Sequence, residues 1–136
     1  MNVEFVLYED KYKDEVIDLI NNSFNNHHIN NILVDDNVIG LVGLIDNKVV
    51  SYLNITICVD VVRNSKYSVI NYVCVDNNYR GKSIGKLMME EALKISKDYG
   101  CSLVKLTSNS KKEIANKMYQ SMGFGIRETN LYEKVI

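Results

Sequence analysis

The sequence predicts an α/β (α+β) fold in which helices flank one mixed, partly antiparallel sheet. Strand-like and helix-like segments are distributed along the 136 residues, with no linker, repeat or low-complexity block. Three strand-like segments follow one another in the middle of the chain, which favours antiparallel neighbours. The second half alternates strand and helix, which is typical of parallel pairs. A chain of this length is expected to form a single domain over residues 1–136.

Six segments have the apolar content and spacing of strands. They are residues 2–7, 38–45, 48–59, 67–75, 102–107 and 124–135. The first alternates apolar and polar side chains. Between the second and third lies Asp46-Asn47, a pair that predicts a tight hairpin turn.

Three segments have helical periodicity. They are residues 11–22, 84–99 and 111–122. In the second, apolar residues recur every three or four positions from Ile84 to Ile95, and Gly100 is expected to end the helix. The asparagine-rich residues 21–31 interrupt any pattern, so they are expected to form a loop or a short frayed helix.

Composition excludes several classes of function. Sixteen basic and seventeen acidic residues give a net charge of −1, so we expect no nucleic-acid partner. No apolar run approaches the ~20 residues of a membrane span, and no signal peptide is recognisable, so we expect no membrane partner and a cytoplasmic location. The cysteines Cys58, Cys74 and Cys101 are odd in number and lack CxxC spacing, which predicts buried structural thiols and no metal site.

The most informative local feature is a glycine-containing turn between a strand and a helix. The apolar strand ends near Val75, Arg80-Gly81 follow, and the helical pattern starts at Ile84. Backbone N–H groups at such a helix start suit phosphate oxygens. The turn is neither a Rossmann GxGxxG nor a P-loop, because it lacks the Gly-Lys-Ser/Thr ending. It predicts a phosphate-bearing ligand.

Together with a second motif, this turn resembles the GNAT (GCN5-related N-acetyltransferase) family. The family pattern Arg/Gln-x-x-Gly-x-Gly/Ala falls on Arg80, Ser83 and Gly85, with Ser83 where the family usually has glycine. The pattern Ala-x-x-x-Tyr-x-x-x-Gly-Phe falls on Ala115, Tyr119, Gly123 and Phe124. The resemblance covers residues 67–124 closely and the first half by element order. It implies a mostly antiparallel central sheet of six to seven strands flanked by about four helices.

The resemblance implies an N-acetyltransferase that moves the acetyl group of acetyl-CoA directly to a primary amine of a small molecule or peptide. The residues that it implies for binding acetyl-CoA are Val73, Cys74, Val75, Arg80, Gly81, Lys82, Ser83, Ile84, Gly85, Lys86, Asn109, Asn116 and Tyr119. The Val73 N–H would stabilise the oxyanion of the tetrahedral intermediate, and Tyr119 would protonate the departing thiolate. Homodimers occur in the family, so a homodimer is an open possibility.

The general base stays open at this point. Some family members carry a Glu where this chain has Asn71, and an amide takes up no proton. Asn71 could instead orient a water. The amine could lose its proton through a water chain, or to a carboxylate such as Asp35 or Asp36. His27 and His28 are either exposed loop residues or groups that face the acceptor.

Other residues have two interpretations each. Asn109 is a helix cap or a cofactor contact, and Asn116 is a solvent-exposed residue or a cofactor contact. Five strand residues are candidates for the acceptor cleft or for packing: Tyr8, Tyr52, Asn54, Tyr67 and Tyr72. The alternative function is a non-catalytic CoA-binding sensor or partner module, against which Tyr119 argues. A nucleotide-phosphate-binding domain is disfavoured by the absent P-loop ending. Residues 106–112 resemble family members that act on small amines.

Overall fold

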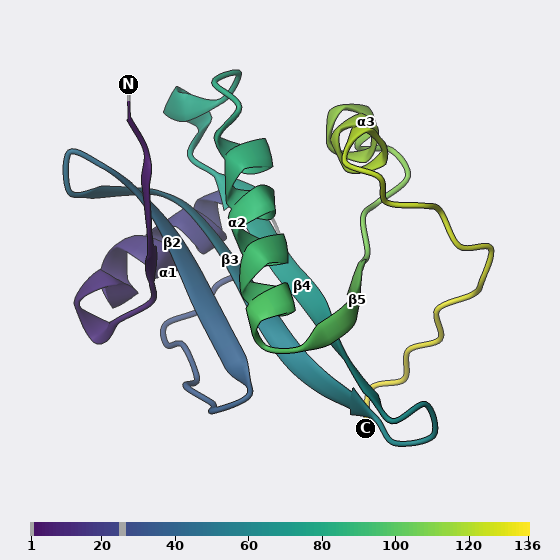
Figure 1. Cartoon of the computed structure of the whole chain (residues 1–136). Helices are drawn as coiled ribbons and strands as arrows, with labels where there is room; N and C mark the ends of the chain where they lie inside the picture. Colours follow the sequence, from purple (N-terminus) through teal and green to yellow (C-terminus); the bar gives the residue numbers. More distant parts are fainter. Residues whose placement is uncertain (1, 25–26) are drawn as a thin grey trace.

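One mixed sheet of five strands organises the molecule, in the order β1-β2-β3-β4-β5 (Figure 1). The computed structural model describes residues 2–24 and 27–136. The strands are β1 (Glu4–Leu7), β2 (Val38–Ile45), β3 (Lys48–Asp60), β4 (Ser65–Val75) and β5 (Cys101–Leu106). The first four pair antiparallel and β5 pairs parallel to β4. This confirms the α+β class with a mixed, mostly antiparallel sheet.

Helices cover both faces of this sheet. Helix α1 (Lys13–Ser23) lies on one face and α2 (Ile84–Asp98) on the other, while α3 (Glu113–Ser121) follows β5 (Figure 1). Two short 3₁₀ turns, η1 (Asp10–Tyr12) and η2 (Asn77–Tyr79), precede α1 and α2. The described residues thus form three α-helices, where about four were expected. Of the predicted asparagine-rich loop, Asn25 and Asn26 lie outside the described residues.

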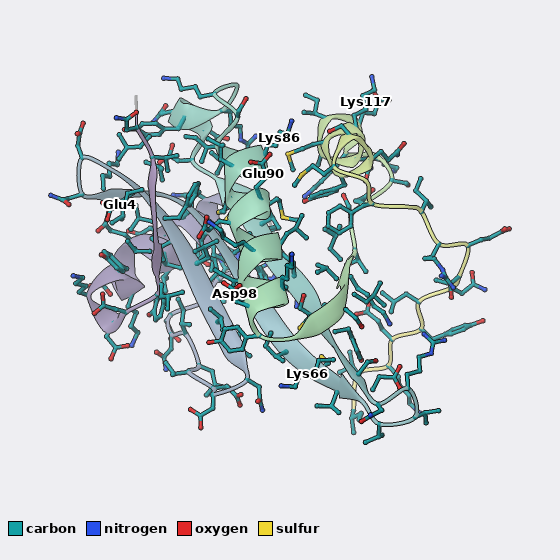
Figure 2. All side chains as sticks on the ribbon, viewed as in Figure 1. Glu4, Lys66, Lys86, Glu90, Asp98 and Lys117 are labelled. Carbon is teal, nitrogen blue, oxygen red and sulfur yellow. The ribbon has the colours of Figure 1, made fainter. Side chains whose placement is uncertain are left out.

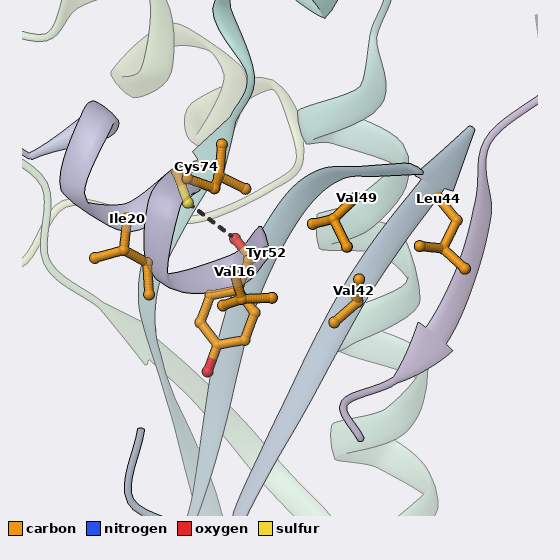
Figure 3. Close-up of a cluster of buried hydrophobic side chains, with 8 residues drawn as sticks. Val16, Ile20, Val42, Leu44, Val49, Tyr52 and Cys74 are labelled. Carbon is orange, nitrogen blue, oxygen red and sulfur yellow. Dashed lines mark hydrogen bonds between the residues drawn. The ribbon is translucent and has the colours of Figure 1, made fainter. Parts of the chain in front are cut away.

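Two hydrophobic clusters fix α1 and α2 to the sheet, because successive strand side chains point to opposite faces. The cluster under α1 contains Val16, Leu19, Ile20, Val42, Leu44, Val49, Tyr52 and Cys74 (Figure 3). The cluster under α2 contains Leu41, Leu53, Ile55, Ile70, Met88, Met89, Ala92 and Tyr119. Since Tyr119 belongs to the second cluster, α3 packs on the α2 side of the sheet.

Turn chemistry accounts for two of the boundaries. Asp46 and Asn47 both adopt positive φ, 50° and 64°, so the predicted hairpin between β2 and β3 is confirmed. Gly100, with φ of +85°, ends α2 at the predicted position.

The predicted last strand, residues 124–135, is wrong. This segment forms no strand and runs outside the sheet as an extended tail (Figure 1). Phe124 packs against the cluster under α2, but the apolar side chains after it stay in solvent: Ile126 is 82% exposed and Val135 97% exposed. Alternation supplies an apolar face, but a strand also needs an edge with which to exchange hydrogen bonds. The described tail pairs with none, so the sheet has five strands and not six or seven.

Candidate functional site

The candidate site lies where β4 extends past β5. Their parallel pairing ends at Ile70 opposite Leu106, the last residue of β5, whereas β4 continues to Val75. Beyond Ile70, the edge of β4 that faced β5 has no strand partner in the described part of the chain. Backbone groups on that edge are available to a ligand that lies along the strand.

A bulge in β4 lies at this same point. Asn71 is opposite Asn54 and Cys74 is opposite Tyr52, so three steps along β4 match two steps along β3. Tyr72, inside the bulge, has φ of 58°, a conformation that non-glycine residues adopt rarely. The extra residue also changes which face the side chains occupy. Ile70 packs under α2, yet Cys74, four residues later, packs under α1.

Next to the bulge is a cavity of about 350 Å³ between the end of β4, the end of β5 and α3. Its walls include all three residues that the sequence assigned to catalysis, Asn71, Val73 and Tyr119, and also Asn109. The fold therefore brings together residues that are up to 48 positions apart in the sequence. The volume falls within the range of small-ligand sites, ~300–1,000 Å³.

Tyr119 is held firmly at this cavity. Its side chain is only 9% exposed, and its ring meets the ring of Phe124 edge to face at 6.0 Å. Gly123, with φ of +93°, turns the chain so that the Phe124 N–H donates to the Tyr119 carbonyl at 3.1 Å. Burial raises the pKa of the Tyr119 phenol above its ordinary value, so the group keeps its proton at neutral pH.

The glycine-containing turn before α2, which we call the phosphate turn (residues 80–83), has a backbone conformation suited to binding an anion. Gly81 has φ of +77°, and Ser83 stands at the start of α2 in the left-handed region, with φ of 61° and ψ of 17°. The Ser83 side chain makes no capping bond. The first helical hydrogen bond runs from the Leu87 N–H to the Ser83 carbonyl. Helix geometry therefore leaves the amides of Ile84, Gly85 and Lys86 without an acceptor inside the helix, pointing outward at its positive end.

Two contacts connect this turn to the end of β4. The Arg80 Nε donates to the Val75 carbonyl at 3.4 Å. A Cβ added to Gly85 would lie 3.8 Å from both Val75 and Met118 of α3, so three elements meet there. Lys86 on α2 and Lys117 on α3 both lie at this end of the molecule (Figure 2). The turn itself is outside the cavity wall, so the site has two parts along the free edge of β4.

Several assigned residues lie away from the cavity or serve the fold. The Cys74 side chain points into the α1 cluster and donates to the Tyr52 carbonyl at 3.7 Å (Figure 3), so it does not line the cavity. Burial raises the pKa of this thiol to about 12. The Asn116 amide donates to the Asn109 carbonyl at 2.9 Å and does not line the cavity. The Asn109 side chain accepts from the Lys111 N–H at 2.9 Å, in a turn before α3.

The three cysteines differ in burial. Cys74 is buried as predicted, whereas Cys58 and Cys101 are half-buried, so that part of the thiol prediction was wrong. Gly81 and Lys82 are exposed at the turn.

His27 is a wall residue and not an exposed loop histidine. Its Nε2 lies 3.1 Å from the Tyr72 hydroxyl, and its ring meets those of Phe24 and Tyr72 at 5.5 and 5.3 Å. Its Nδ1 is buried without a partner in the described structure. His28 is exposed, and Asp35 and Asp36 are exposed away from the cavity.

Of the five strand residues proposed for the acceptor cleft, only Tyr72 lines the cavity. Sequence reasoning missed Phe24 and Lys112, which line it as well. Phe24 follows α1 directly, and Lys112 precedes α3, so a search of residues just beyond helix ends would have included both.

Two absences hold for the described residues only. None of their His, Cys, Asp or Glu side chains gather in a group of three that could hold a metal ion. No helix among them is long and apolar enough to cross a membrane.

Comparisons with known proteins identify the family and the fold. The model of the acetyltransferase (GNAT) family matches residues 3–124. A transcriptional regulator from Bacillus halodurans C-125 superimposes with a TM-score of 0.88 at 18% identity, over 98% of this chain and 100% of that one. The aminoglycoside N-acetyltransferase AAC(6')-Iy, solved in complex with CoA, gives 0.85 at 14%, over 98% and 95%.

A further similar structure is the ribosomal-protein-alanine N-acetyltransferase from Brucella melitensis biovar Abortus 2308. It superimposes with a TM-score of 0.82 at 15% identity, over 98% of this chain and 99% of that one. No protein of the curated set is similar enough to count as a match. At these identities the solved structures show the fold, and the family model covers most of the chain. The chain belongs to the GNAT family of acetyltransferases.

Proposed function

We propose that this protein is an N-acetyltransferase that transfers the acetyl group of acetyl-CoA directly to a primary amine in a ternary complex. One observation carries the proposal: the bulge at Val73 and the buried phenol of Tyr119 line the same cavity, beside the free edge of β4. The family uses acetyl-CoA. Both groups that the transfer requires, an oxyanion donor and a proton donor, are thus available at one place.

The donor half of the site binds the cofactor along β4. The pyrophosphate binds the amides from Ile84 to Lys86 at the start of α2, where the helix dipole favours an anion. The pantetheine arm lies on the free edge of β4 beside Val75, as a strand partner in place of β5. The thioester then reaches the cavity at Val73.

Transfer follows from these positions. The amine attacks the carbonyl carbon of the thioester, forming the C–N bond, and the Val73 N–H stabilises the oxyanion. A donor of this kind contributes ~10²–10³ in rate. As the C–S bond breaks, the Tyr119 hydroxyl protonates the thiolate to give CoA.

Removal of the amine proton is assigned to the pair His27 and Tyr72. The Asn71 amide takes up no proton, whereas a neutral imidazole has a ring nitrogen that accepts one. The Tyr72 hydroxyl accepts the amine proton and passes its own to Nε2 of His27, 3.1 Å away. His27→Gln and Tyr72→Phe should lower kcat/KM by similar factors at neutral pH, with no further loss in the double variant. Additive losses would contradict a shared proton path.

Ligand-induced stabilisation tests the donor assignment first. Acetyl-CoA and CoA should raise the melting temperature, whereas ATP and NAD should not, because a ligand at 100 times its Kd adds ~2.7 kcal/mol. Stabilisation by ATP without acetyl-CoA would refute the proposal. A thiol-release assay with an amine panel then separates an enzyme from a non-catalytic CoA-binding sensor, which would be stabilised but release no thiol above background.

A further inference from the structure

The cavity wall has an unusual charge balance for an enzyme that accepts amines. Its polar side chains are mostly neutral, from Asn71, Thr107, Ser108 and Asn109. Among the described wall residues, only Lys112 carries a fixed charge, that of its ammonium group. No carboxylate lines the described cavity, and the residues left undescribed, Met1, Asn25 and Asn26, carry none either.

Lys112 extends over the cavity from the residue before α3. Its Nζ lies 5.4 Å from the centroid of the Phe24 ring, which follows α1, so the side chain crosses between the two elements. This cation–π contact holds the ammonium beside the ring cluster of Phe24, His27 and Tyr72. The neighbouring carboxylate, that of Glu113, is exposed and does not line the cavity.

Charge complementarity then selects among amines. A polycationic acceptor would meet Lys112 and find no carboxylate on this wall to offset the repulsion. An acceptor with a carboxylate would gain a charge-assisted hydrogen bond to the ammonium group. We propose that the acceptor is a small primary amine that also carries a carboxylate, and that Lys112 binds this carboxylate. The inference rests on the proposed function and names its substrate class.

The test compares matched acceptors. With acetyl-CoA, thiol release is measured for the common amino acids, dipeptides with a free carboxyl end, the corresponding carboxamides, spermidine and kanamycin. Amines with a carboxylate should be the best acceptors, and replacing the carboxylate by a carboxamide should lower kcat/KM by roughly tenfold or more. Lys112→Gln should produce the same loss for the acid and leave kcat/KM for the carboxamide unchanged.

Lys105→Gln is the control. It removes one positive charge and one cation–π contact, with the Tyr67 ring at 4.5 Å, but Lys105 lies outside the cavity wall. This variant should keep wild-type selectivity. The inference would be overturned if both lysine variants lost the same factor in kcat/KM for the acid. It would also be overturned if the enzyme preferred the carboxamide, spermidine or kanamycin, or if it turned over no amine that carries a carboxylate. Stabilisation by acetyl-CoA is read separately, so the substrate class can fail while the proposed function stands.

Discussion

Replacing Tyr119 by Phe isolates the hydroxyl that we propose as the proton donor. The ring is 9% exposed and packs against Phe124, and phenylalanine keeps this packing. The fold should therefore persist, with a melting temperature close to that of the wild type. What is lost is the proton that the departing thiolate takes up.

The expected effect on rate is large. Loss of a positioned acid lowers kcat by ~10²–10⁴, which corresponds to about 2.7–5.5 kcal/mol in the barrier. Burial raises the pKa of Tyr119, so the acid form persists through neutral pH and is lost only as pH rises through a value above the ordinary ~10 of a phenol. Wild-type activity should thus have an alkaline limb above pH ~10 that the variant lacks.

Single-turnover thiol release at saturating acetyl-CoA and acceptor measures the chemical step without product release. Phe124→Leu is the matched control, because it removes the ring contact and leaves the hydroxyl. A Tyr119→Phe variant within about twofold of wild-type kcat, or one whose loss equals that of Phe124→Leu, would refute the role of proton donor and leave a packing residue.

Three further predictions concern the framework around the site, each measured by urea denaturation. Ser83→Gly should raise the free energy of unfolding by about 0.5–1 kcal/mol, because Ser83 holds a φ of 61° that glycine adopts without strain. Ser83→Ala should leave the free energy of unfolding nearly unchanged, because the Ser83 hydroxyl makes no capping bond. Equal effects of the two substitutions would contradict this explanation. The buried hydroxyls of Ser68 and Ser96 lie 2.8 Å apart, so either alanine variant should cost about 1–3 kcal/mol and the double variant less than the sum. Burial raises the pKa of the Cys74 thiol to about 12, so with rising pH this thiol ionises first in the unfolded chain. The free energy of unfolding should therefore fall as pH rises from about 8.5 toward 12, by up to ~1.4 kcal/mol per pH unit. In Cys74→Ala the free energy of unfolding should depend less on pH over this range.

The sequence predicted best what neighbouring residues determine. The start of α2 at Ile84 and its end before Gly100 follow from apolar spacing and a glycine stop, and both boundaries are confirmed. The hairpin at Asp46-Asn47 is confirmed for the same reason, since the two residues themselves favour positive φ. Each of these features depends on fewer than about twenty consecutive residues.

The bulge at Tyr72 could not be predicted. Tyrosine has no preference for positive φ, so its own identity gives no signal, and the register between β3 and β4 decides the conformation. The same limit explains the mistaken strand at residues 124–135. Its alternation is real, but the outcome depends on an available edge elsewhere in the fold.

The two halves of the site, the phosphate turn and the cavity, also differ in whether neighbouring or distant residues form them. The phosphate turn is made by consecutive residues. In the cavity wall, by contrast, His27 contacts Tyr72, 45 positions away, and Lys112 contacts Phe24. A substitution in the cavity wall need not disturb the turn at the start of α2, because Phe24 and His27 line the cavity and the turn lies outside that wall. Variants of Lys112 should therefore change which amine is acetylated and leave acetyl-CoA affinity unaltered. The choice of acceptor amine can then evolve through residues such as Lys112, just before α3, while the donor site at the start of α2 stays the same because consecutive residues form it.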